Sequence, residues 1–301
     1  MKLLLTGAFK YSEQQLQALR DLGAETVFQN DERGIPETDF SLVDAVVCNG
    51  LFLYHSLQEF PNLRFVQLTS AGLDRVPLED FHAKGICLCN ARGVYSIPMA
   101  EWAVCGVLSL YKHTLNFSEN QSNRLWEKDR TVRELYGDTV LIVGCGSVGT
   151  ECAKRFKSMG MNIAAADVKR PQSKEYDAYF SMPELDKALK TADVVVLTLP
   201  LTEETYHLFD KKRFSQCKKG AIVVNISRGA VVNEADLTDA IKCGQIGGAV
   251  LDVFETEPLP TESPLWNMEN VIITPHNSFI GDGNHNRLIE VIMSNLKGFL
   301  K

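Results

Sequence analysis

The chain has 301 residues, of which 45% are hydrophobic and 23% charged, and its formal net charge is -7. This composition is that of an ordinary folded protein and excludes a disordered chain, while the acidic balance argues against a nucleic-acid-binding surface. A single hydrophobic core stops growing near this length, so we expect two domains.

The eight cysteines include no C-x-x-C pair, and the spacing of Cys87 and Cys89 suits neither a zinc site nor a disulfide framework. We expect reduced, mostly buried thiols and no metal site. The N-terminal apolar run is too short for a secretory signal. The longest apolar stretch, residues 97–111, contains Glu101 and is too short to span a bilayer. The protein is therefore expected in the cytoplasm.

Short apolar runs alternate with amphipathic segments, which is typical of parallel strands joined by helices and predicts an α/β fold. The first half predicts a helix at residues 12–22 and strands at 2–5, 45–48, 65–68 and 86–89. The pattern restarts after Gly137 with six predicted strands, at 139–143, 162–166, 194–199, 221–226, 248–252 and 271–274. Six strands with intervening helices suit a complete dinucleotide-binding sheet.

Two further helices are predicted. Residues 97–120 are apolar on all sides, which indicates one long helix buried between domains or subunits. Its part from 99 to 115 is a candidate dimer contact. Residues 286–300 carry one apolar stripe, which favours a terminal helix that packs back on the first domain.

A glycine-rich segment, residues 143–149, lies between a predicted strand and a predicted helix, which is the context that makes such a turn a dinucleotide site. Gly144 permits the tight turn, Gly146 lets the backbone approach a pyrophosphate, and Gly149 allows the helix to pack closely on the strand. The alternative is that these glycines only make a turn.

The cofactor preference depends on the end of the next strand. Asp167 can accept hydrogen bonds from the adenosine ribose hydroxyls, and its charge would repel a 2′-phosphate, which favours NAD over NADP. Lys169 and Arg170 lie just beyond it and are the counter-signal, because they could attract that phosphate.

Several stretches occur together in an order that is far more specific than any one of them. They are the glycine turn and residues 63–74, 93–101, 134–140, 199–205, 225–229, 251–258 and 274–276. In these stretches the chain resembles the D-isomer-specific 2-hydroxyacid dehydrogenase family over nearly its full length. The resemblance implies two doubly wound parallel-sheet domains. A Rossmann NAD-binding domain, residues 99–282, would be inserted into a flavodoxin-like substrate domain, residues 1–98 and 283–301.

The resemblance also implies a catalytic set. Arg228, a planar fork of donors, would hold the substrate carboxylate and polarise the adjacent carbonyl. His276 would be the general acid that protonates the carbonyl oxygen, and Glu257 would hydrogen-bond the imidazole and stabilise its charged form. Glu255 lies in the same stretch, but the family pattern puts the partner directly before Pro258. We therefore expect Glu255 to be solvated.

Binding residues follow from the same resemblance. The backbone amides of Ala71 and Gly72 would bind the substrate carboxylate together with Arg228 and His276, although a simple turn is the alternative for that segment. Asp252 and the backbone at Ile226 would lie near the nicotinamide carboxamide, and Ser278 could contact the nicotinamide or the substrate. The other expected cofactor contacts are Ser147, Val148, Leu199, Pro200 and Thr205.

Residues 49–55 bear on the identity of the substrate, because they contain no lysine or arginine that could bind a substrate phosphate. We therefore expect an unphosphorylated 2-oxo acid, with an apolar side chain that meets Phe52 or Tyr54, and His55 is a candidate substrate contact. The family often has a small, glycine-containing stretch where this chain has residues 277–281, so Phe279 is expected to narrow the pocket.

The expected reaction is direct hydride transfer between NAD and the second carbon of a D-2-hydroxy acid, in the cleft between the two domains. We expect a homodimer without nucleic-acid or membrane partners. No regulatory domain is expected after Lys301, which disfavours feedback control. One alternative is an NADH-binding sensor like the corepressors that resemble this family. Another is a phosphite dehydrogenase, whereas formate is disfavoured because formate enzymes carry glutamine where Glu257 stands.

Overall fold

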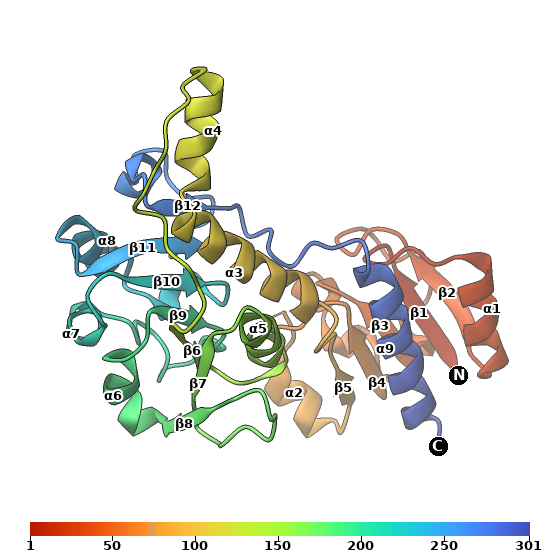
Figure 1. Cartoon of the computed structure of the whole chain (residues 1–301). Coiled ribbons are helices and arrows are strands. Elements are labelled where there is room, and N and C mark those ends of the chain that lie inside the picture. The colour runs from red at the N-terminus through yellow and green to blue at the C-terminus, as the bar shows by residue number, and fades with distance from the viewer. Residues whose placement is uncertain (74) are drawn as a thin grey trace. The chain divides into compact units, whose positions relative to one another are not determined.

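The computed structural model describes residues 1–73 and 75–301, so Asp74, the last residue of the stretch 63–74, lies outside the described residues. The chain divides into two compact units, one made of Met1–Tyr95 with Gly281–Lys301 and the other of Ser96–Ile280. Within the described residues, twelve strands form a five-stranded and a seven-stranded sheet, and all pairings are parallel (Figure 1). The predicted α/β class with two parallel-sheet domains is confirmed.

The first unit contains the five-stranded sheet, whose order β2-β1-β3-β4-β5 is the flavodoxin-like one. Its strands are β1 (Lys2–Thr6), β2 (Glu25–Gln29), β3 (Ala45–Cys48), β4 (Phe65–Leu68) and β5 (Cys87–Cys89). Its helices are α1 (Glu13–Asp21), α2 (Leu78–Ala83) and α9 (Asn284–Phe299). The apolar stripe of α9 buries Leu288, Ile292 and Leu296 in the same cluster as Leu3 and Phe65. The last helix of the chain therefore belongs to the first unit.

The second unit contains the seven-stranded sheet, in the order β12-β11-β10-β9-β6-β7-β8. Six of its strands follow the Rossmann order, and β12 extends it. The strands are β6 (Thr139–Val143), β7 (Asn162–Asp167), β8 (Ala178–Ser181), β9 (Val194–Leu197), β10 (Ala221–Asn225), β11 (Ile246–Leu251) and β12 (Val271–Ile273). The helices are α3 (Ser96–Tyr111), α4 (Thr114–Ser122), α5 (Ser147–Ser158), α6 (Leu185–Leu189), α7 (Lys211–Gln216) and α8 (Glu234–Lys242).

Alternation along the central strands explains why the second sheet is buried on both faces. In β6, Val140 and Ile142 face one hydrophobic cluster, whereas Leu141 and Val143 face another. Side chains of a strand alternate between the two faces of a sheet, and a parallel sheet needs apolar cover on both. The packed strands hold their carboxyl ends at one edge, where the loops of the site begin.

Three expectations about the elements were wrong. The strands β2 and β8 were not predicted, and the second sheet has seven strands among the described residues rather than six. Both lie at a sheet edge, where short strands need not be apolar. The predicted helix over 97–120 is two helices, α3 and α4, because the chain adopts a left-handed backbone at His113 (φ 50°). Among the described residues, none of the helices combines the length and apolarity that a membrane span requires.

Candidate active site

The glycine turn after β6 is shaped by close backbone packing. Gly144 has a left-handed backbone (φ 94°), and a Cβ there would lie 2.8 Å from the carbonyl oxygen of Thr198. A Cβ at Gly149 would lie 2.2 Å from the carbonyl oxygen of Gly144. By contrast, a Cβ at Gly146 would have no neighbouring atom within 4 Å. The outer two glycines are thus required by the fold, whereas Gly146 leaves open space for a ligand to approach the backbone.

The first turn of α5 fits a dinucleotide pyrophosphate. Gly146 is its N-cap and supplies no capping side chain, and Ser147 and Val148 form the first turn. The first N–H groups of a helix have no intrahelical acceptor, and the helix dipole favours an anion there. Leu199 lies beside the turn, with its Cδ2 atom 3.1 Å from the Cβ position of Gly144. The residues present therefore fit the phosphate end of a dinucleotide.

Asp167 ends β7 next to the glycine turn. Its carboxylate accepts hydrogen bonds from the backbone N–H of Cys145 at 2.5 Å and of Val168 at 2.6 Å. These bonds fix the carboxylate beside the turn, where a ribose would follow the pyrophosphate. Lys169 and Arg170 are both exposed.

The segment after β9 is held by Thr205. Its hydroxyl donates to the carbonyl oxygen of Pro200 at 2.7 Å and accepts from the N–H of Thr202 at 2.7 Å. Thr205 thereby closes the loop on itself and sets the course of the backbone at Leu199 and Pro200.

Arg228 follows β10 in a turn that Asn225 organises. The buried Asn225 side chain accepts from the N–H and the hydroxyl of Ser227 and donates to the carbonyl oxygen of Arg228 at 3.1 Å. The Arg228 Nη1 atom donates to the carbonyl oxygen of Ser227 at 2.8 Å. Ile226, between Asn225 and Ser227, has a buried side chain, so only its backbone could contact a ligand. Asn225 opens the stretch 225–229 noted in the sequence, but its role in shaping this turn was not predicted.

Gly229 brings the Arg228 turn against the segment that carries Glu257. A Cβ at Gly229 would lie 1.9 Å from the carbonyl carbon and oxygen of Phe254. Only glycine permits this approach. Phe254 in turn donates its N–H to Glu257 Oε1 at 3.1 Å, so the residue that packs against Gly229 also holds the Glu257 carboxylate.

His276 and Glu257 form a hydrogen-bonded pair. The Nδ1 atom of His276 lies 2.9 Å from Glu257 Oε2, and both side chains are partly exposed. Because Nδ1 faces the carboxylate, Nε2 is the ring nitrogen on the side away from Glu257. His276 has a left-handed backbone (φ 50°), and such a conformation in a residue other than glycine is often found at functional sites.

Asp252 explains how the His276 loop is held. Its fully buried carboxylate accepts from the Thr274 hydroxyl at 2.6 Å and from the N–H groups of Asn277 (2.7 Å) and Ser278 (3.0 Å). Its carbonyl oxygen also accepts from the N–H of His276 at 2.8 Å. The carboxylate expected near the nicotinamide carboxamide thus faces its own chain, and Ser278 is buried beside it.

In the first unit, Asn90 orients the loop that carries Ala71 and Gly72. The Asn90 side-chain amide donates to the carbonyl oxygen of Ala71 at 2.7 Å, and the Ser70 hydroxyl donates to that of Gly72 at 3.1 Å. The C=O and N–H of a trans peptide point in opposite directions, so the N–H of Gly72 points away from Asn90. This geometry suits a backbone donor for a carboxylate. No motif in the sequence pointed to Asn90.

The expectations for residues 49–55 need correction. His55 is buried and packs edge-on against Phe40 at 5.1 Å, so it belongs to the core. The Phe52 ring likewise packs within that core, 5.1 Å from another phenylalanine. Tyr54 is exposed, but the guanidinium of Arg33 lies over its ring at 5.5 Å. A cation therefore lies beside a segment that itself contains none, so the lack of lysine and arginine in residues 49–55 does not by itself disfavour a phosphorylated substrate.

Glu255 is not simply solvated. Its Oε2 atom lies 3.1 Å from His207 Nε2, and its Oε1 atom accepts from the N–H of Glu234 at 2.7 Å. No motif could predict this contact, because His207 lies 48 residues away in the sequence.

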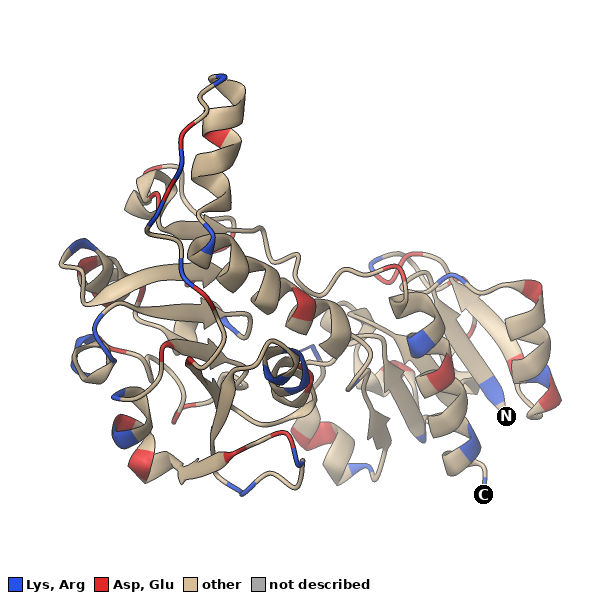
Figure 2. Ribbon diagram, in the orientation of Figure 1, with Lys and Arg blue, Asp and Glu red and all other residues tan. Residues whose placement is uncertain are grey.

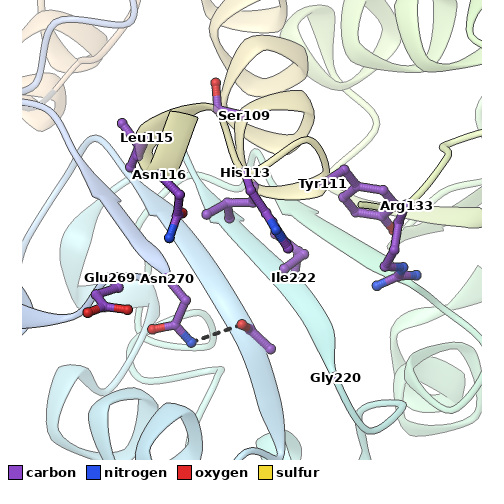
Figure 3. A pocket seen from close by; sticks show the side chains of 12 residues that line it. Ser109, Tyr111, His113, Leu115, Asn116, Arg133, Gly220, Ile222, Glu269 and Asn270 are labelled. Carbon is purple, nitrogen blue, oxygen red and sulfur yellow. Dashed lines mark hydrogen bonds between the residues drawn. The ribbon is translucent and has the colours of Figure 1, made fainter. Parts of the chain in front are cut away.

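A cavity of about 340 Å³ lies at the amino ends of the strands of the seven-stranded sheet, opposite the ends that carry the candidate site (Figure 3). Its walls include His113 at the junction of α3 and α4, and Gly220 and Asn270 just before β10 and β12. Ligands of open parallel sheets bind outside the carboxyl ends of the strands, whereas this cavity lies at the amino ends. Among the described residues, no cluster of three or more His, Cys, Asp or Glu side chains could hold a metal ion.

Residues 104–278 match the family model described as D-isomer specific 2-hydroxyacid dehydrogenase, NAD binding domain. A glyoxylate reductase of Korarchaeum cryptofilum is 34% identical, over 79% of this chain and 74% of its own.

Two solved structures share the whole fold. A D-isomer specific 2-hydroxyacid dehydrogenase from Xanthobacter autotrophicus in complex with NADPH has a TM-score of 0.80 and 26% identity, over 99% of this chain and 95% of its own. A D-lactate dehydrogenase from Aquifex aeolicus complexed with NAD and lactic acid has a TM-score of 0.77 and 26% identity, over the same shares. The chain belongs to the D-isomer-specific 2-hydroxyacid dehydrogenase family, whose members are NAD(P)-dependent oxidoreductases.

Proposed function

We propose that this protein transfers a hydride between NAD(H) and a small 2-oxo acid or D-2-hydroxy acid. The observation that carries the proposal is the bond of 2.9 Å between His276 Nδ1 and Glu257 Oε2. This pair lies at the edge of the sheet that also carries the glycine turn and the Arg228 turn. The similarity to a glyoxylate reductase supports a small 2-oxo acid.

We propose the following role for each residue. Bound NAD(H) supplies or accepts the hydride. Arg228 binds the substrate carboxylate with its fork of donors and draws charge from the adjacent carbonyl. His276 Nε2 gives a proton to the carbonyl oxygen in reduction and takes it back in oxidation. Glu257, oriented by the N–H of Phe254, stabilises the imidazolium. The N–H groups of the Ala71–Gly72 loop are further donors for the carboxylate.

For the cofactor, we propose NAD rather than NADP. Solved relatives contain one or the other, so the choice depends on this chain's own residues. The carboxylate of Asp167 is fixed beside the glycine turn, and its charge disfavours a 2′-phosphate. We expect kcat/KM for NADH to exceed that for NADPH at least tenfold. In Asp167→Asn this ratio should fall, and a wild-type preference for NADPH would contradict the proposal.

The proposed function is tested by initial rates of NADH oxidation with a panel of 2-oxo acids. The panel contains glyoxylate, pyruvate, hydroxypyruvate, 2-oxoisocaproate and phosphohydroxypyruvate, and phosphite and formate are supplied with NAD in the reverse direction. We expect reduction of at least one small 2-oxo acid and a D product on a chiral column. Tight NADH binding without turnover of any 2-oxo acid would overturn the proposal in favour of a sensing protein. Turnover of phosphite alone would assign a phosphite dehydrogenase.

We also propose a homodimer, on the basis of an arm formed by residues 112–133. In the arm, α4 projects away from the sheet of its unit (Figure 1) and has no buried residue. Leu115 and Leu125 are half exposed and Trp126 is 97% exposed. Apolar side chains exposed on a projecting element mark an interface. Acidic and basic residues alternate on the returning segment, at 127–130 (Figure 2), which suits a polar rim.

Light scattering tests the dimer. We expect the mass of two chains at micromolar concentration and a smaller average mass for Trp126→Asp. The mass of one chain for the wild type would contradict it.

We further propose a cytoplasmic location. All eight cysteines are free thiols, as in proteins of a reducing compartment. Recovery of the protein in a secreted or membrane fraction would overturn this proposal.

A further inference from the structure

A second histidine–glutamate pair lies outside the proposed catalytic set. His207 Nε2 lies 3.1 Å from Glu255 Oε2, and the other oxygen of Glu255 accepts from the N–H of Glu234 at 2.7 Å. The N–H of Glu255 in turn donates to Glu234 Oε2 at 3.3 Å. One carboxylate thus binds two other segments of the chain at once.

The three segments joined by this carboxylate are those that carry the proposed site. His207 ends the segment that begins with Leu199 and Pro200. Glu234 follows the Arg228 turn at the start of α8. Glu255 itself stands two residues before Glu257.

Backbone contacts add to the same connection. The N–H of His207 donates to the carbonyl oxygen of Ala230 at 2.8 Å, and Phe209 pairs with Val232 in an isolated parallel bridge. These contacts tie the segment after β9 to the chain just beyond Arg228. The side-chain pair extends the tie to the Glu257 segment, which meets the Arg228 turn at Gly229.

The environment of the pair holds His207 in one position. Its backbone is left-handed (φ 46°), and the Tyr206 ring stacks on its imidazole at 4.0 Å between centroids. The side chains of His207 and Glu255 are 26% and 34% exposed, so the pair is partly shielded from water. Burial raises the pKa of Glu234, and the charge of Glu255 adds to this effect. Glu255 is therefore close to a second carboxylate and is paired with His207 on its other oxygen.

We propose that His207 and Glu255 form a clamp that positions Glu257 relative to the Arg228 turn, so that Glu257 and Arg228 are both correctly placed for hydride transfer. The clamp residues act through Glu257 and Arg228 and do not touch the substrate. This inference rests on the proposed function. Misplacement of a catalytic group by about 1 Å can cost two orders of magnitude in rate, so loss of a clamp has a measurable effect on kcat.

The test is a double-mutant cycle with His207→Asn, Glu255→Ala and the double variant, assayed on the best 2-oxo acid. Asparagine tolerates a left-handed backbone and is too short to reach Glu255. We expect each single variant to lower kcat about tenfold, with KM for NADH changed less than about twofold. We expect the double variant to be no worse than about twentyfold, because both changes break the same bond between His207 and Glu255, so their effects overlap. Glu255→Gln keeps an acceptor for the N–H of Glu234, so it should retain about a third of kcat or more.

Glu262→Ala is the matched control, because it removes a nearby exposed glutamate whose side chain is bonded only to its neighbour Thr261 among the contacts described. It should keep wild-type kcat, and thermal midpoints of all variants verify that they are folded. Wild-type kcat in both single variants, or losses that multiply in the double variant, would overturn the clamp.

If the wild type reduces no 2-oxo acid, the proposed function fails and the clamp is judged by hydrogen exchange. In Glu255→Ala the N–H of Glu234 loses its acceptor, and we expect its exchange to rise at least tenfold together with that of the 254–257 segment. Glu262→Ala should leave both unchanged. Unchanged exchange in Glu255→Ala would overturn the clamp independently of any activity.

Discussion

An aspartate is buried at each end of the strands of the seven-stranded sheet, at the amino ends (the amino edge) and at the carboxyl ends (the carboxyl edge). The two carboxylates have different partners. At the amino edge, Asp193 lies 2.7 Å from Lys218 Nζ and accepts from the N–H of Thr139 at 3.0 Å. At the carboxyl edge, the donors to the Asp252 carboxylate among the described residues are a hydroxyl and two backbone N–H groups, all of them neutral.

The different partners of Asp193 and Asp252 indicate different roles for the two carboxylates. A carboxylate paired with a cation at the amino edge links the starts of neighbouring strands. A carboxylate that accepts from loop N–H groups at the carboxyl ends of the strands holds the His276 loop in place. We therefore expect changes at the carboxyl edge to affect turnover and changes at the amino edge to affect unfolding.

Apart from a change at His276 itself, the largest expected effect is that of Arg228→Lys. Lysine keeps the charge but loses the planar fork that binds a carboxylate through two bonds. We expect kcat/KM for the 2-oxo acid to fall about 10²- to 10³-fold, with the Kd for NADH changed little. Steady-state kinetics and fluorescence titration measure the two quantities, and Arg20→Lys on the exposed surface of α1 is the control. A loss below threefold would remove Arg228 from the site.

Next in size is Asp252→Asn. The amide puts a donor where Oδ2 accepts from the N–H of Ser278, so two donors face each other and the His276 loop shifts. We expect kcat to fall about 10- to 100-fold. If kcat is unchanged while the free energy of unfolding drops, Asp252 serves stability alone and the contrast between the two edges is lost.

Asp193→Asn tests the amino edge. Loss of the bond to Lys218 should lower the free energy of unfolding by about 1–3 kcal/mol, while kcat stays within about twofold of wild type. Urea unfolding monitored by circular dichroism gives the first quantity. A tenfold loss of kcat in a variant that remains folded would show that the amino edge also serves turnover.

The smallest effect concerns the thiol in the glycine turn. Burial raises the pKa of Cys145 to about 12, and the same cause raises that of Cys152 to about 12. A raised pKa means that the reactive thiolate forms only as the pH approaches 12, so alkylation should stay slow from pH 7 to 9. Iodoacetamide at pH 8 should modify the exposed Cys87, Cys105 and Cys243 before Cys145 and leave turnover unchanged, as peptide mass spectrometry and rate assays would report. Rapid modification of Cys145 in the folded protein would contradict this.

The central strands were predictable, because a strand buried on both faces reads as an uninterrupted apolar run. The residues 45–48 and 65–68 were placed at the bounds that the structure has. The edge strands β2 and β8 mix polar and apolar residues, so periodicity alone does not distinguish them from loops. The break between α3 and α4 was also hidden, because neither glycine nor proline occurs at His113.

The contacts of the candidate site were predictable where a short motif contains them and not where several segments meet. Spacing within a motif identified Gly144 and, through the resemblance, the pair of His276 and Glu257. The support around them depends on residues distant in sequence, such as the contact of Asn90 with the Ala71 loop. The bond of Glu255 to His207 is of the same kind, since no local pattern encodes it.

The central claim is that His276 is the acid and base of a 2-hydroxyacid dehydrogenase, and His276→Asn tests it most directly. Asparagine tolerates the left-handed backbone but cannot transfer the proton. We predict that reduction of the best 2-oxo acid falls at least 10³-fold, while NADH binds with nearly unchanged Kd and His82→Asn, an exposed control, keeps wild-type kcat. Turnover within tenfold of wild type in His276→Asn would contradict the account.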